Sequence, residues 1–274
     1  MILAALLSVV LLTQGAAPGR DPSLPPSAEQ AKAALDASPR HGEYVGVPMT
    51  GGPALKTWIS YPERKDKAGV VVVIQEVFGL TDWLRGVADQ LAKEGFIAVA
   101  PDMVSGFGPG GGGTDSVGSR DDVVALVHKI TPDEVVRRLN AVRDWALKIP
   151  AGNGKIATVG FCWGGGQSFA YAGVQPTLAA AVVFYGVSPD PAVIDVIQAP
   201  VLGHYGGDDE RVDATVPPAE TQMKKLGKSF EVHVYAGAGH GFLRDQSGRE
   251  GANLKATQQA WPRTVAFLKE KLKS

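Results

Sequence analysis

The chain has 274 residues, 45% of them hydrophobic and 20% charged, and its formal net charge is −1. This length and composition predict one large globular α/β domain. Because the net charge is close to zero and no block of like charges occurs, the composition argues against nucleic acid and against a membrane surface as partners.

The first 17 residues have the pattern of a secretory signal peptide. Residues 1–12 are apolar and uncharged but too few to cross a bilayer, and residues 13–17 are mostly small. No Lys or Arg precedes the apolar run, so a frayed or wrongly assigned start is the alternative. We expect residues 1–17 to be a signal peptide, 18–38 a flexible linker rich in Pro, Ser and Ala, and 39–274 the folded domain. The protein would then be periplasmic or secreted.

Strand and helix patterns alternate through the rest of the chain. Apolar, β-branched runs predict strands, and amphipathic spacing or capping residues predict helices. In chain order we expect strands at 43–48, 55–61 and 70–74, a helix at 82–94, a strand at 97–100, a helix after the capping box at 131–134, strands at 156–160 and 179–184, a helix at 191–197, a strand at 201–205, a helix at 217–226, a strand at 230–235 and a helix at 254–272. This alternation predicts a single domain with a mostly parallel sheet and helices on both faces. The glycine-rich stretch 106–118 has the length of a lid or a disordered loop.

The segment 160–164, Gly-Phe-Cys-Trp-Gly, is a G-x-nucleophile-x-G elbow, and it contains the only cysteine of the chain. It follows an apolar strand and leads into small residues that can begin a helix. Such a strand–turn–helix corner raises a nucleophile above the sheet. A lone cysteine is ordinarily a small buried hydrophobe. The elbow favours the other interpretation, a reactive thiol at Cys162.

Acid and base side chains follow two later strands. Asp209 ends the segment 206–209, and His240 lies in the segment 237–241. Together with Cys162 they occur in the order nucleophile, acid, base, each at the carboxyl end of a predicted parallel strand, where catalytic groups gather. Cys162 would attack a carbonyl carbon, His240 would hold and return a proton, and Asp209 would fix the imidazole tautomer. Asp208 is the alternative acid.

Glu76 comes directly after the first buried strand of the parallel sheet. A carboxylate there is costly unless it is paired or functional. Glu76 could accept the thiol proton of Cys162 or compete for it, and a structural ion pair with Arg85 is the alternative. The backbone N–H groups of Val77 and Trp163 would form an oxyanion hole in this arrangement.

Four segments together resemble the dienelactone hydrolase family of α/β-hydrolases: 75–79, 160–165, 206–209 and 237–242. The resemblance extends from about residue 39 to the C-terminus. It implies an α/β-hydrolase fold and a Cys–His–Asp triad of Cys162, His240 and Asp209 that cleaves a carboxylic ester or lactone through a thioester acyl-enzyme. It also implies that Glu76 takes the thiol proton when substrate arrives. We expect no cofactor and no metal.

The resemblance further implies a small-molecule substrate whose carboxylate is held by arginines. Arg244 matches one of these arginines. Arg120 is the only arginine between residue 101 and the capping box at 131–134, but the glycine-rich stretch makes its placement uncertain. We expect the protein to be a monomer or a small homo-oligomer.

Two other classes of function are open. A non-catalytic binding module could use the same scaffold, because fold does not imply function. A thiol-redox protein could use Cys162 as its peroxidatic or sensor residue, although the chain has no resolving cysteine. The glycine run at 110–113 lacks the Lys and Ser or Thr of a phosphate-binding loop.

Overall fold

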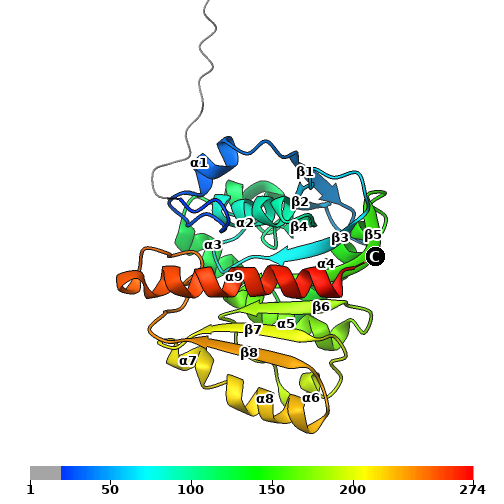
Figure 1. Ribbon diagram of the computed structural model, residues 1–274. Coiled ribbons are helices and arrows are strands. Elements are labelled where there is room, and N and C mark those ends of the chain that lie inside the picture. The colour runs from blue at the N-terminus through cyan, green and yellow to red at the C-terminus, as the bar shows by residue number, and fades with distance from the viewer. Residues whose placement is uncertain (1–19, 274) are drawn as a thin grey trace, which may run out of the picture.

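The computed structural model describes residues 20–273, so the predicted signal peptide lies outside the described residues. An eight-stranded sheet forms the centre of the molecule, with strand order β1-β2-β4-β3-β5-β6-β7-β8 (Figure 1). β1 is antiparallel to β2 and β2 to β4, and all other neighbouring strands are parallel. The strands are β1 (Gly42–Val47), β2 (Leu55–Ser60), β3 (Ala68–Ile74), β4 (Ile97–Pro101), β5 (Gly152–Phe161), β6 (Ala180–Phe184), β7 (Val201–Gly206) and β8 (Phe230–Tyr235).

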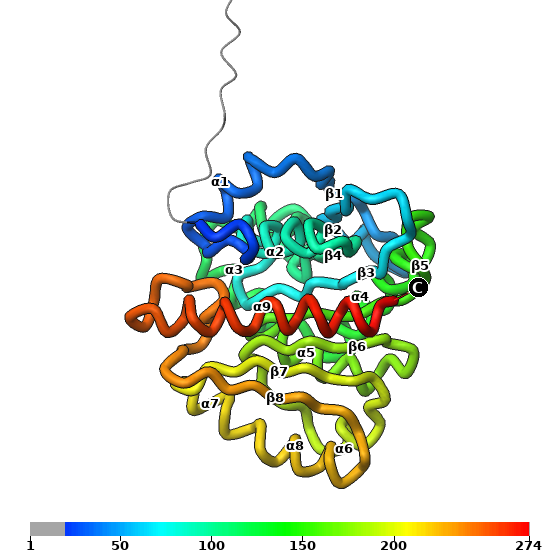
Figure 2. The backbone as a smooth tube through the Cα atoms, viewed as in Figure 1, coloured from blue at the N-terminus to red at the C-terminus, as the bar shows by residue number. Residues whose placement is uncertain are grey.

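Helices cover both faces of this sheet (Figure 2). α4, α5, α6 and α8 pack on one face, and α2 and α9 pack on the other. The predicted fold class, an α/β domain with a mostly parallel sheet, is therefore confirmed. The helices are α1 (Ala31–Asp36), α2 (Asp82–Lys93), α3 (Arg120–Val127), α4 (Pro132–Ala146), α5 (Trp163–Val174), α6 (Pro191–Ile194), α7 (Glu210–Asp213), α8 (Val216–Lys225) and α9 (Ala252–Lys271).

The valine run of β3 explains why the sheet is buried on both faces. Val70 and Val72 belong to the apolar cluster under α4 and α5, whereas Val71 and Val73 belong to the cluster under α2 and α9. Alternate residues of a strand point to opposite faces, so only a continuous apolar run can fill both layers. This arrangement holds the carboxyl end of β3 rigidly in the middle of the sheet.

Residues 20–38, expected to be a flexible linker, pack instead on α2. Leu24, Pro25 and Pro26 are buried, and α1 lies beside α2 (Figure 1). Burial of these apolar side chains offsets the entropy lost when the segment is ordered. The composition predicted a flexible linker, but the buried residues 24–26 attach this segment to the domain.

The glycine-rich stretch is ordered and is followed by a helix that the sequence analysis did not predict. Its backbone closes on itself through hydrogen bonds from the Gly106 and Gly108 N–H groups to the Gly112 carbonyl oxygen. The buried carboxylate of Asp102 accepts hydrogen bonds from the backbone N–H and the hydroxyl of Thr114. The chain then enters α3, which begins at Arg120. None of the helices between residues 20 and 273 is both long and apolar enough to span a bilayer.

Candidate active site

The corner between β5 and α5 is a strained elbow. Cys162 has φ 55° and ψ −118°, an uncommon conformation for a residue with a side chain. A Cβ on Gly160 would lie 1.8 Å from the Gly164 carbonyl oxygen, and one on Gly164 would lie 2.3 Å from the carbonyl oxygen of Gln75. The flanking glycines are therefore required by close backbone approach, and the geometry is that of a nucleophile elbow.

The structure brings Cys162, His240 and Asp209 together. The His240 Nε2 atom lies 3.0 Å from the Cys162 Sγ atom, and the His240 Nδ1 atom lies 2.5 Å from the Asp209 Oδ2 atom. The Asp209 carboxylate is buried, whereas Asp208 lies at the surface in an ion pair with Arg249. This contact chain connects a thiol, an imidazole and a carboxylate in the order that proton transfer requires. The geometry thus favours Asp209 over Asp208.

Glu76 lies two residues beyond the end of β3 and is only 4% exposed. Its partner is Arg244, whose Nε atom is 2.9 Å from the Glu76 Oε2 atom, although the N–H does not point along a hydrogen-bond direction. Arg85, the alternative partner, pairs with Asp82 instead. Burial raises the pKa of Glu76 to about 7, against the opposing effect of the two nearby guanidinium groups, Arg244 and Arg120. Glu76 is therefore poised to gain or lose a proton near neutral pH.

The surroundings of Cys162 favour the neutral thiol. Burial raises its pKa above the ordinary value, and the charge of Glu76 adds to this effect. The backbone N–H groups of Trp163 and Val77 are directed at the sulfur and oppose the rise. Both predicted oxyanion-hole donors thus point at the reacting atom, where they would face the oxygen of a bound carbonyl group.

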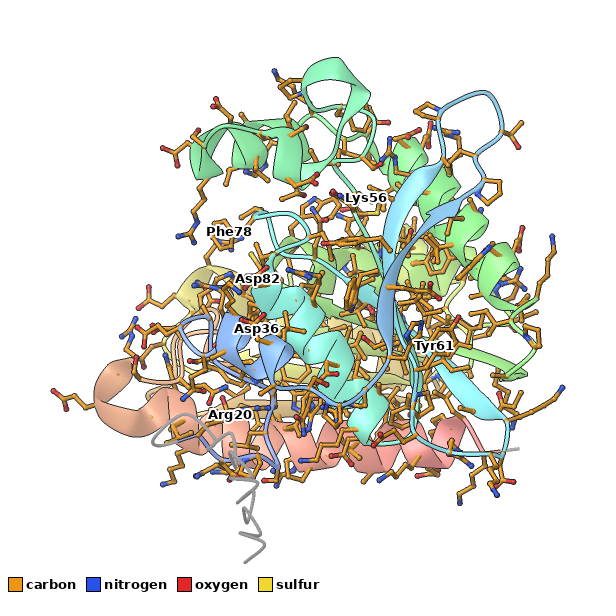
Figure 3. All side chains as sticks on the ribbon, turned by 90° about the horizontal axis from the view of Figure 1, so that it is seen from above. Arg20, Asp36, Lys56, Tyr61, Phe78 and Asp82 are labelled. Atoms are coloured by element: carbon orange, nitrogen blue, oxygen red, sulfur yellow. The ribbon has the colours of Figure 1, made fainter. Side chains whose placement is uncertain are left out.

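A cavity of about 450 Å³ is lined in part by Arg244, the partner of Glu76, whereas Cys162, His240 and Glu76 are not among its lining residues. Phe78 forms part of its wall, and Figure 3 shows Phe78 near Asp82, the first residue of α2. The guanidinium carbon of Arg120 lies 3.6 Å from the centre of the Phe78 ring, and that of Arg244 lies 5.2 Å from it. The unpredicted helix α3 therefore brings Arg120 into the same cavity as Arg244, because Arg120 is its first residue. Two cations beside one apolar ring suit an anionic, partly apolar ligand.

Tyr185, which follows β6, is a residue of the site that was not predicted from the sequence. Its ring is fully buried, it meets the His240 ring edge to face at 5.2 Å, and its backbone φ is 42°. Its hydroxyl has no hydrogen-bond partner among the described residues, and burial together with the nearby Glu76 charge raises its pKa well above the ordinary value. Its position at the carboxyl end of β6, the strand next to β5, could have indicated that Tyr185 lies near the site.

The part of the chain that the structure describes contains no candidate metal site. Nowhere between residues 20 and 273 do three or more His, Cys, Asp or Glu side chains gather in a way that could hold a metal ion.

Comparison with known proteins places the chain in a family. The sequence model of the dienelactone hydrolase family matches residues 55–272. A candidate carboxymethylenebutenolidase of Yersinia pestis is 31% identical over 241 residues, which cover 82% of this chain and 88% of that protein. The structure of a candidate dienelactone hydrolase from Klebsiella pneumoniae subsp. pneumoniae has a TM-score of 0.74 at 26% identity, covering 84% of this chain and 99% of that chain. A dienelactone hydrolase from Anabaena variabilis has a TM-score of 0.65 at 21% identity, covering 85% and 99% of the two chains. The resemblance inferred from the sequence is confirmed, and the chain belongs to the dienelactone hydrolase family, as a hydrolase with the α/β-hydrolase fold.

Proposed function

We propose that this hydrolase cleaves a carboxylic ester or lactone with Cys162 as nucleophile, through a thioester acyl-enzyme. The observation that carries the proposal is the contact chain at the elbow: Sγ to Nε2 at 3.0 Å and Nδ1 to Oδ2 at 2.5 Å. In this chain of contacts Asp209 holds the His240 tautomer, and His240 faces the sulfur.

Activation of the thiol depends on Glu76 and Arg244. In the free enzyme Arg244 pairs with Glu76 and favours its ionised form. A substrate carboxylate that binds Arg244 and Arg120 draws this positive charge away from Glu76. The proton affinity of Glu76 then rises, and Glu76 takes the thiol proton of Cys162. The thiolate forms only when substrate is present.

The thiolate attacks the carbonyl carbon, and the N–H groups of Val77 and Trp163 bind the oxygen that becomes negatively charged. The carbon–oxygen bond to the leaving group breaks, the leaving oxygen takes the proton held by Glu76, and a thioester remains on Cys162. His240 then removes a proton from water, the hydroxide attacks the thioester, and the departing thiolate recovers that proton from His240. One water is consumed, and an acid and an alcohol are formed.

The pocket favours a substrate that carries a second, free carboxylate. Arg120 and Arg244 both face Phe78 in the same cavity, so a carboxylate could bind two guanidinium groups while its apolar part contacts the ring. A neutral ester would lack this interaction and would leave the pairing of Arg244 with Glu76 undisturbed.

The test is a panel of lactones and aryl esters, each offered with a free carboxylate and with that carboxylate methylated. We expect the wild type to hydrolyse the carboxylate-bearing members faster, Cys162→Ala to lose activity on all of them, and Arg244→Ala to lose the preference. Full activity of Cys162→Ala would contradict the mechanism. Stoichiometric binding without turnover would favour a binding module, and rapid sulfenic acid formation in dilute peroxide without esterase turnover would favour a thiol-redox protein.

We also propose export to the periplasm or the medium. The support is the apolar, uncharged run 1–12 followed by small residues at 13–17. Expression of the full chain in a bacterial host, followed by fractionation and N-terminal sequencing, tests the proposal. Cytoplasmic protein that retains Met1 would contradict it.

A further inference from the structure

The segment 20–30, called the strap below, is fastened across α2. Leu24 is 3% exposed and belongs to the same apolar cluster as Trp83 and Leu84. The Lys93 Nζ donates a hydrogen bond to the Pro22 carbonyl oxygen at 2.6 Å. Figure 3 shows the labelled residues Arg20 and Asp36 on the side of the molecule where Phe78 and Asp82 lie. The strap precedes residues 55–272, which match the family.

The strap is also bonded to the loop that carries Arg244. The Ala28 N–H donates to the Arg244 carbonyl oxygen at 3.0 Å. The Gln246 side chain, two residues after Arg244, donates from Nε2 to the Pro25 carbonyl oxygen of the strap at 2.9 Å. It also donates to the Leu243 carbonyl oxygen within the loop at 3.1 Å. The Arg244 carbonyl group and the Gln246 side chain are therefore bonded to the strap, whereas the Arg244 N–H donates within the loop to the Gly241 carbonyl oxygen.

Ala28 itself lines the cavity together with Phe78, Arg120 and Arg244. We propose that the strap is a specificity element: it forms one wall of the substrate cavity and holds the Arg244 loop where the guanidinium group can meet a substrate carboxylate. This inference rests on the proposed function and deepens it. The strap residues are positioning residues, since they act on the substrate through Arg244 and through the shape of the cavity.

The first test places a competing charge on the strap. Ala28→Asp puts a carboxylate at the cavity wall near Arg244, and Ala33→Asp makes the same change at an exposed site on α1 outside the cavity lining. The measured quantity is the ratio of kcat/KM for a carboxylate-bearing aryl ester to kcat/KM for its methylated analogue. We expect Ala28→Asp to lower this ratio about tenfold, mainly through KM, and Ala33→Asp to keep the wild-type ratio.

The second test displaces the strap without adding charge. A Cβ on Gly86 of α2 would lie 2.7 Å from the Pro26 Cγ atom, so Gly86→Ala pushes the strap outward. Because alanine favours the helix more than glycine does, α2 itself should remain folded. Gly52→Ala is the control, since its Cβ meets nothing within 4 Å. We expect Gly86→Ala to accelerate hydrogen exchange of the Ala28 amide and to lower the same selectivity ratio.

The outcomes separate this inference from the proposed function. If the wild type hydrolyses both esters with a preference for the carboxylate, and neither Ala28→Asp nor Gly86→Ala lowers that preference, the role of the strap is refuted while the hydrolase mechanism stands. If Ala28 amide exchange accelerates in Gly86→Ala but the preference is unchanged, the clamping of Arg244 is refuted. If the wild type hydrolyses neither ester, the proposed function fails first.

Discussion

Glu76→Gln should stabilise the protein at alkaline pH. Glu76 is 4% exposed, and its burial raises its pKa from the ordinary value of 4.5 to about 7. An acid with a raised pKa binds protons more tightly in the folded state than in the unfolded state. The wild type therefore loses stability as the pH rises from 4.5 through 7, and this loss is fully present above pH 7.

The size of the effect follows from the two pKa values. The difference between 4.5 and about 7 corresponds to about 3 kcal/mol, at about 1.4 kcal/mol for each pH unit. A glutamine of the same shape cannot ionise, so the variant avoids this cost. It also leaves Arg244 without its partner, but that side chain is 26% exposed and can turn towards water. We therefore expect a net gain of about 1–3 kcal/mol at pH 8.

The assay is urea unfolding at pH 5 and at pH 8, with Glu220→Gln as the matched control. Glu220 lies exposed on α8, so its replacement makes the same chemical change without burial. The stability advantage of Glu76→Gln should be largest at pH 8 and should shrink towards pH 5, whereas Glu220→Gln should follow the wild type at both. Equal stability of Glu76→Gln and wild type at both values of pH would refute the reasoning on burial.

Three further predictions concern the triad and the elbow. Asp209→Asn should lower kcat roughly 100-fold or more, because the imidazole tautomer is no longer fixed, whereas Asp208→Asn should keep the wild-type kcat in the same steady-state assay. Alkylation of Cys162 by iodoacetamide in the free enzyme should accelerate only above pH 9, because burial and the Glu76 charge raise the pKa of the thiol above 9.0. A midpoint of the alkylation rate near pH 7 would contradict a neutral thiol in the free enzyme. Gly160→Ala should lower the free energy of unfolding by about 3 kcal/mol or more, because its Cβ would lie 1.8 Å from a backbone oxygen, and Gly52→Ala should change it by less than about 0.5 kcal/mol in the same denaturation experiment.

The residues that the sequence located well are those fixed by the sheet. Glu76, Cys162, Asp209 and His240 each follow a run that forms a parallel strand, and the carboxyl ends of such strands meet at one edge. Their gathering at this edge could then be predicted without knowledge of any loop. The sequence favours Asp209 over Asp208, but only the structure shows which side chain of this tight turn is directed towards His240.

The features that the sequence did not locate depend on tertiary contacts. The strap contains mostly residues that are common in linkers, and its burial against α2 and its hydrogen bonds to Lys93 and to the Arg244 loop are tertiary contacts. Because of the glycine-rich stretch before it, α3 was not predicted, and neither was the contact of Arg120 with Phe78. Tyr185 adopts a positive φ although it is not a glycine, and only the folded structure shows that its ring packs against the rings of His240 and Phe242.

In the proposed mechanism, Arg244 connects substrate recognition to the protonation state of Cys162. It lies in the cavity, it pairs with Glu76, and the strap holds its backbone. A carboxylate that binds Arg244 therefore changes the proton affinity of Glu76 and, through it, the ionisation of Cys162. An enzyme built in this way keeps a neutral thiol until a substrate of the right charge arrives. Since the thiolate is the form that oxidants attack, the arginine that selects the substrate in the proposed mechanism would also protect the only cysteine of the chain.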